Sequence, residues 1–313
     1  MVFQGGVLIR RGQVREGLAL HDEGMAMAVG GDLSQLATVQ IFCQVIRTCY
    51  ELGDYRRAQE WTEAIEDCFV RTGLSSFPGD CETHRIEIMI RSGAWALAEQ
   101  MAHRACASTQ YFDPSHAGLA FANIGEIRLR IGDLASAEEA FAKAEELGAS
   151  PLPGLARLEL LRDRPAEAAA LINAALVGRG WDRVDRARLL PDQVTIALTV
   201  GDFDTARSAA AELAEPAQPF SSKALLAAAE AACGALALAT GQGDPLPSLR
   251  RGVELWHAAG RRTRAHGSGW RWVPHWTKPV SPKQHALSWP QPERALTASA
   301  PGWTPRPPLN YSS

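Results

Sequence analysis

One hexapeptide pattern recurs along the first 260 residues and constrains the fold more than any other feature of the sequence. It consists of glycine, usually aspartate, a large apolar residue, two variable positions and alanine. The clear copies begin at Gly53, Gly93, Gly132 and Gly201, and a weaker copy begins at Gly12, with a second weak copy at Gly243. The intervals from 12 to 53, 93 and 132 are 41, 40 and 39 residues, and the interval of 69 residues from 132 to 201 accommodates a shortened, degenerate unit around Asp163 to Ala168. A period near 40 indicates an internally repeated structure.

The residue types in this pattern suit the joint of a helix hairpin. Glycine ends a helix in the left-handed conformation, aspartate caps the next helix, and a small alanine lets two helices approach closely. We therefore predict repeat-defining structural roles for Gly53, Asp54, Ala58, Gly93, Ala98, Gly132, Asp133, Ala137, Gly201, Asp202 and Ala206.

The clearest repeat runs from Gly118 to Pro151 and predicts two amphipathic helices. Apolar or small residues follow one face of each helix, and both faces need a partner. They are Phe121, Ile124, Gly125 and Leu129 on the first helix, and Ala137, Phe141 and Ala144 on the second. The expected fold is all-α, with about six stacked hairpins in a right-handed superhelical solenoid and a concave groove lined by the first helices.

This unit resembles the tetratricopeptide (TPR) repeat at its signature spacings. The matching residues are Phe121, Ile124, Gly125, Gly132, Asp133, Ala137, Phe141 and Ala144, with Pro151 near the usual terminal proline. The other units depart from the consensus: Cys49 stands where a tyrosine is usual, and the period exceeds the consensus of about 34 residues. The resemblance therefore implies longer loops and less regular stacking.

A narrower resemblance covers most of residues 1–260. Segments 55–62, 84–88, 125–134 and 186–191 resemble the helical repeat region of large LuxR/MalT-type bacterial transcriptional regulators, which is also found linked to nucleotidyl cyclase modules. In that family an ATPase or cyclase module precedes the repeats, and a helix-turn-helix domain often follows them. The chain has neither a phosphate-binding G-x-x-x-x-G-K-[ST] motif nor a basic helix-turn-helix pattern. We therefore expect a fragment or truncated relative of such a regulator.

Composition divides the chain into a repeat domain, 1–260, and a tail, 261–313. The tail holds nine of the 19 prolines and five of the nine tryptophans. It carries +7 and the whole chain −3, so residues 1–260 carry −10. The prolines predict an irregular, disordered segment. We hypothesise that the tail is frameshifted or otherwise unselected sequence, because its codons permit another repeat helix after Gly260 when the last base of each codon is read with the first two of the next; the alternative is a genuine Trp/Pro-rich tail, and the gene sequence decides between them.

Residues with reactive side chains form no known catalytic or metal-binding pattern. The six cysteines include no C-x-x-C pair and are predicted to be reduced thiols. His84, His103 and His116 do not have ligand spacing. The acid pairs at 138–139 and 145–146 are predicted to face solvent, and Trp61 and Trp95 to pack at hairpin joints rather than stack on a ligand. We predict no catalytic residue, cofactor or metal.

The predicted function is a non-enzymatic protein-interaction and signal-sensing scaffold in the cytoplasm. A protein or peptide would occupy the concave groove, and the acidic balance of residues 1–260 favours basic partners. The alternative is a small-molecule sensor with its ligand in the groove. Neither a membrane helix nor direct nucleic-acid binding is expected. Uncapped ends would leave some apolar residues partly uncovered and promote self-association: Leu236, Leu238, Val253 and Trp256.

Overall fold

The computed structural model describes residues 1–72, 79–109, 113–177, 183–217 and 222–259, all of which belong to one unit of the chain. Within these ranges the secondary structure is helical and includes no strand, so the all-α prediction is confirmed. The predicted tail, 261–313, lies outside the described residues. The helices are α1 (Val2–Arg10), α2 (Val14–Gly30), α3 (Gln35–Glu51), α4 (Tyr55–Thr72), α5 (Gly79–Ser92), α6 (Trp95–Thr109), α7 (Pro114–Ile131), α8 (Leu134–Glu146), α9 (Gly154–Leu161), α10 (Pro165–Val177), α11 (Arg183–Val200), α12 (Phe203–Ala217), α13 (Lys223–Thr240) and α14 (Leu246–Ala258).

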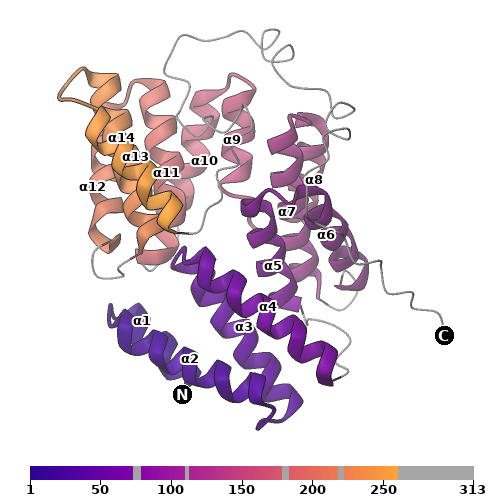
Figure 1. Ribbon diagram of the computed structural model, residues 1–313. Helices are drawn as coiled ribbons and strands as arrows, with labels where there is room; N and C mark the ends of the chain where they lie inside the picture. Colours follow the sequence, from indigo (N-terminus) through magenta and orange to yellow (C-terminus); the bar gives the residue numbers. More distant parts are fainter. Residues whose placement is uncertain (73–78, 110–112, 178–182, 218–221, 260–313) are drawn as a thin grey trace, which may run out of the picture. The chain divides into compact units, whose positions relative to one another are not determined.

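Consecutive helices pair as hairpins, and each hairpin packs against the next one along the chain (Figure 1). The described residues form seven such pairs, from α1–α2 to α13–α14, where the sequence predicts about six. The α9–α10 pair lies where the sequence predicts a shortened, degenerate unit, and its joint uses Asp163 rather than glycine in the left-handed conformation. Each odd-numbered helix also contacts the next odd-numbered helix, from α1 through α13.

The joints follow the hexapeptide pattern. Gly53, Gly93, Gly132 and Gly201 all have positive φ angles, between 66° and 87°. After three of these glycines, the aspartate carboxylate accepts a hydrogen bond from a backbone N–H three residues later, in the manner of a helix cap. The four pattern alanines are fully buried: Ala58, Ala98, Ala137 and Ala206.

Close helix approach within the hairpins depends on glycines that face bulky side chains. A Cβ atom on Gly125 of α7 would overlap the ring of Phe141 on α8, and one on Gly234 would overlap Leu249. The same principle brings α1 against α2, where Gly5 and Gly17 face each other's backbone. A substituted glycine at any of these positions would force the two helices apart.

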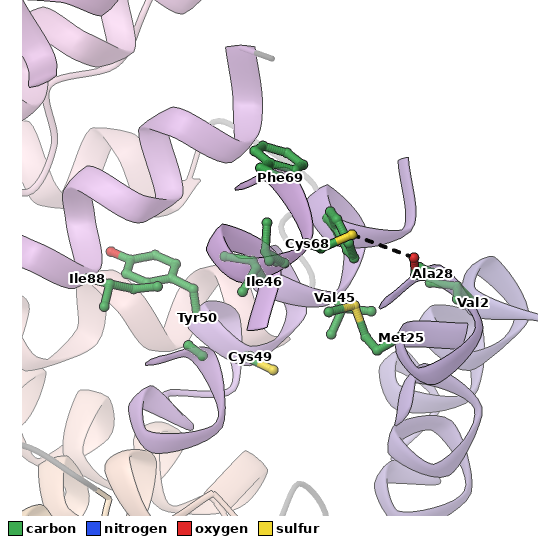
Figure 2. Packing of buried hydrophobic residues seen from close by; sticks show 13 residues of the cluster. Val2, Met25, Ala28, Val45, Ile46, Cys49, Tyr50, Cys68, Phe69 and Ile88 are labelled. Carbon is green, nitrogen blue, oxygen red and sulfur yellow. Dashed lines mark hydrogen bonds between the residues drawn. The ribbon is translucent and has the colours of Figure 1, made fainter. Parts of the chain in front are cut away.

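One apolar core joins the first five helices. Met25, Phe42, Val45 and Ile65 are fully buried there, and the Cys68 thiol donates to the Ala28 carbonyl over 4.0 Å (Figure 2). Tyr50 lies at one side of this core, beside Ile88, and its hydroxyl points away from the other labelled side chains in Figure 2. The core therefore fixes the ring of Tyr50 and leaves its polar end for other contacts.

Two tryptophans and one cysteine bear on the sequence predictions. Trp61 and Trp95 are half-buried against apolar cores, and the Trp95 indole donates to the Ile90 carbonyl over 3.0 Å, which is the joint packing predicted for them. The cysteine prediction is wrong at Cys43, which is disulfide-bonded, whereas Cys49, Cys68, Cys106 and Cys233 are free thiols. Tertiary folding decides which thiols come within bonding distance, so spacing alone does not reveal such a bond.

Helix α13 bears on the expectation that the chain has no membrane helix. By length and composition alone, this one helix in the described part of the chain could cross a membrane, whereas the sequence analysis expects none. The core helix of a soluble protein passes the same test, and α13 packs against α11, α12 and α14.

The four apolar residues predicted to be partly uncovered lie on α13 and α14. Leu238 is exposed, and the other three are half-buried: Leu236, Val253 and Trp256. A cytoplasmic location and self-association stay predictions.

Candidate ligand-binding site

The candidate site is a cluster of charged and aromatic side chains on the odd-numbered helices. Three helices each carry an acidic residue and an arginine four positions apart, which places both on one helical face. We call the following residues the inner cluster: Tyr50 of α3, Glu87 and Arg91 of α5, Glu126 and Arg130 of α7, Arg157 of α9, and Arg188 and Asp192 of α11.

One half of the inner cluster is an ion-paired triad. The Arg157 guanidinium donates to both carboxylate oxygens of Asp192, over 2.6 and 2.7 Å, and to Glu126 over 2.6 Å. The Asp192 side chain is only 6% exposed. Burial raises the pKa of Glu126, but the charges of Arg130 and Arg157 outweigh it and hold this pKa at about 2. The triad therefore stays ionised and joins α7, α9 and α11.

The other half of the inner cluster surrounds Tyr50. The guanidinium carbons of Arg91 and Arg188 lie 5.2 and 5.1 Å from the centroid of its ring, within cation–π distance. Its hydroxyl accepts hydrogen bonds from both arginines, over 3.0 and 3.4 Å. His84 meets the same ring edge-on at 5.9 Å between centroids. Burial raises the pKa of Tyr50, and the two arginine charges offset only part of the rise, so the phenol is neutral near pH 7.

The charge of the inner cluster differs in sign from that of residues 1–260 as a whole. Four arginines stand against three carboxylates, which leaves one net positive charge, whereas residues 1–260 carry −10. The excess acid of the chain therefore lies elsewhere. The overall acidic charge favours a basic partner, but the charge of the inner cluster does not.

Contacts between distant parts of the sequence converge on the same end of α3. Arg188 and Tyr50 are 138 residues apart, and the Ser222 hydroxyl donates to the carbonyl of Leu52, 170 residues away. A Cβ atom on Gly53 would overlap that of Ala224. Hairpin α3–α4 therefore touches hairpins α11–α12 and α13–α14, which are not its neighbours in sequence.

An open cavity of about 670 Å³ lies between α9 and α10. Its lining is mainly apolar, with Glu159, Arg164 and Glu167 among its polar residues. Leu152 and Leu155 approach it from the start of α9, and Leu171 from α10. It has the size of a small-molecule pocket but lacks a buried polar group that would orient a ligand.

The repeat-defining residues singled out in the sequence are not members of the inner cluster, although His84 borders it. The repeat-defining residues occupy hairpin joints and helix interfaces. His84 lies beside Tyr50, and the Asp113 carboxylate contacts the His116 ring over 2.5 Å. No group of three or more His, Cys, Asp or Glu residues in the described ranges could hold a metal ion.

Sequence reasoning did not select the inner cluster, although a signal for it exists. The acid–arginine pairs at 87/91, 126/130 and 188/192 share one spacing, and three of the segments that resemble regulator repeats contain cluster residues, namely Glu87, Glu126 with Arg130, and Arg188. The spacing predicts that both members of a pair share a helical face. It does not predict that α3 and α11 meet.

Comparisons with known proteins add no assignment: no family model, curated protein or solved structure matches the chain.

Proposed function

We propose that residues 1–260 form a TPR-like, right-handed superhelical scaffold with no enzymatic activity of its own. The order of hairpin contacts supports this proposal, because each hairpin packs against the next and the odd-numbered helices contact one another in sequence. The close packing of Gly125 against Phe141 supports it further, because these are two of the residues that resemble the TPR consensus.

The role we propose for this scaffold is ligand sensing, of the kind served by the repeat region of LuxR/MalT-type regulators. The observation that carries the proposal is the contact of Arg188 with Tyr50, which joins helices 138 residues apart at a charged cluster. A ligand bound there would touch both sides of this contact. It would therefore favour the arrangement in which α3 and α11 meet, and binding would change the conformational equilibrium of the scaffold.

A thermal-unfolding screen against a library of metabolites tests ligand sensing. A ligand held at 100 times its dissociation constant should stabilise the protein by about 2.7 kcal/mol. The stabilisation should disappear in the Arg188→Gln variant and persist in Arg207→Gln, because Arg207 is a similarly exposed arginine on α12, away from the cluster. A library in which no compound stabilises the wild type more than Arg188→Gln would contradict the proposal.

The second candidate function is binding of a partner protein, and the cavity between α9 and α10 favours it. Leucines and alanines line this cavity, as expected of a surface that receives an apolar segment. A partner held there should be lost from Leu171→Asp and retained by Arg188→Gln. The opposite result would assign partner binding to the inner cluster.

A further inference from the structure

The two halves of the inner cluster differ in how fully their arginines are paired. Arg157 uses all three guanidinium nitrogens on carboxylates, at 2.6 to 2.7 Å. In the described part of the chain, Arg91 and Arg188 each use a single nitrogen, and both donate to the same phenol oxygen. Glu87 is the carboxylate that forms an ion pair here, with Arg188 over 3.7 Å. The guanidinium nitrogens of Arg157 thus all donate to carboxylates. Among the described residues, Arg91 and Arg188 each retain guanidinium N–H groups that donate no hydrogen bond.

Two positive charges beside one ring repel each other unless an anion separates them. Arg91 and Arg188 both lie about 5 Å from the Tyr50 centroid, and Glu87 supplies one negative charge against two positive ones. A guanidinium group matches the geometry of a carboxylate or phosphate, with two parallel N–H donors for two oxygens. The unfilled requirement at this site is therefore a single anionic group.

We propose that Arg91 and Arg188 bind the carboxylate or phosphate group of a small anion beside Tyr50. This inference rests on the ligand-sensing function proposed above and names the chemical class of the ligand. Tyr50 acts as a positioning residue, because its ring and hydroxyl hold both guanidinium groups at the site. Arg130 adds positive potential at the site. Burial is the largest cause that lowers the pKa of Arg130, and the nearby charge of Arg91 lowers it further, so the two guanidinium groups are close enough to interact.

The surroundings of Tyr50 favour a compact anion over an extended acidic peptide. Its side chain is buried at the end of α3, where Ser222 binds the carbonyl of Leu52 and Arg188 arrives from α11. Three hairpins therefore meet within a few residues of the site. A peptide needs an open groove along several helices, whereas a small anion needs only the converging donors.

Isothermal titration with inorganic phosphate and with citrate, each at an ionic strength held constant with sodium chloride, tests the proposal. Constant ionic strength keeps general screening the same throughout the titration, and the two probes separate phosphate from carboxylate recognition. We expect saturable binding of at least one probe. Arg188→Gln should weaken it roughly tenfold or more, because a charge-assisted bidentate contact is lost. Arg207→Gln should leave it unchanged.

Glu87→Gln provides a test that a loss of folding cannot imitate. Removal of the carboxylate that competes for Arg188 should strengthen binding of the anion, whereas a merely destabilising change would weaken it. The proposal is overturned if neither probe binds, if Arg188→Gln binds as well as the wild type, or if Glu87→Gln weakens binding. If neutral or cationic metabolites instead stabilise the wild type and not Arg188→Gln, the anion inference fails while ligand sensing stands.

Discussion

The hairpin joints and the inner cluster are built on the same helices but follow different rules. At the joints, the same few residue types recur: a left-handed glycine, a capping aspartate and a buried alanine. In the inner cluster, α5, α7 and α11 each contribute an acid–arginine pair, but Tyr50, Arg157 and Arg188 each have a distinct set of partners. Recurring local contacts mark the positions that build the scaffold, and differing partners mark the positions that can acquire a specific role.

Within the inner cluster, a second difference separates stability from binding. The Arg157 triad is buried and saturated with hydrogen bonds, whereas Arg188 is 44% exposed and paired only weakly with Glu87. Buried, fully paired charges destabilise a protein strongly when one partner is removed, and exposed pairs contribute little. The four predictions below test whether this division holds.

The largest expected effect belongs to the helix packing within one hairpin. Phe141→Ala should destabilise the protein by about 3–5 kcal/mol, because its ring is only 1% exposed and fills the space that Gly125 leaves on α7. Chemical denaturation measures the change. Phe203→Ala is the matched control, since Phe203 follows the Gly–Asp joint of another hairpin but is 39% exposed. Equal losses of unfolding free energy in the two variants would show that burial of the Phe141 ring is not the cause of the destabilisation.

Removal of a charge from the saturated triad should have the next largest effect. Asp192→Asn leaves Arg157 without its bidentate partner and should destabilise the protein by about 3 kcal/mol. Arg188→Gln, in the same cluster, should change stability by less than about 1 kcal/mol. Denaturation midpoints of the two variants decide the matter, and a larger loss in Arg188→Gln would reverse the division between structural and binding arginines.

Loss of one cap should have a smaller effect. Asp133→Ala removes the carboxylate that accepts from the Ser136 N–H and should destabilise the protein by about 1 kcal/mol. The control is Glu139→Ala, an exposed position on the same helix, where the change should stay within about 0.5 kcal/mol. Thermal unfolding of both variants supplies the comparison. Indistinguishable midpoints would remove the capping role assigned to the aspartate of the pattern.

Mild acid should destabilise the contact between α1 and α2 before it affects the inner cluster. His21 is fully buried between α1 and α2, where burial lowers its pKa below 6.5 despite the contact of its ring with the Val2 carbonyl. Its contribution to stability is therefore complete above pH 6.5 and declines as the pH falls below that value. The contribution of Glu126 is complete above about pH 4.5 and declines only as the pH falls toward its folded-state pKa of about 2.

Hydrogen exchange at pH 5.5 and 7.5 measures this local difference. Protection of α1 should fall at the lower pH, while protection of α7 and α9 should hold. His21→Gln serves as the control, because its amide does not titrate in this range and the pH dependence of α1 should disappear. Acid-induced exchange that begins in α7 would contradict the assignment of the two pKa shifts.

Much of the scaffold was predictable from the sequence because its determinants are local. The Gly–Asp–apolar–x–x–Ala pattern places the end of one helix, the cap of the next and their close contact within six residues, and the structure has these features at Gly132, Asp133 and Ala137. The α9–α10 hairpin was predicted only as a shortened, degenerate unit, because its joint lacks glycine at the left-handed position, which Asp163 occupies.

The inner cluster was not predictable in the same way. The spacing of Glu87 and Arg91 places both on one face of α5, but no local pattern indicates which distant helix that face will meet. Likewise, the disulfide at Cys43 depends on proximity that folding creates. Sequence periodicity does not predict such contacts, because it gives the faces of each helix and not which distant helices meet in the folded chain.

The helical class, the hairpin turns and the small residues at the helix contacts follow from the sequence, because these properties depend on backbone conformation and on neighbours within a few residues. The fold of the chain was needed to show that Tyr50, Arg91 and Arg188 share one site and that Arg157 is saturated by Asp192 and Glu126. Small rotations between successive hairpins accumulate along a repeat array, and their sum decides which distant side chains meet.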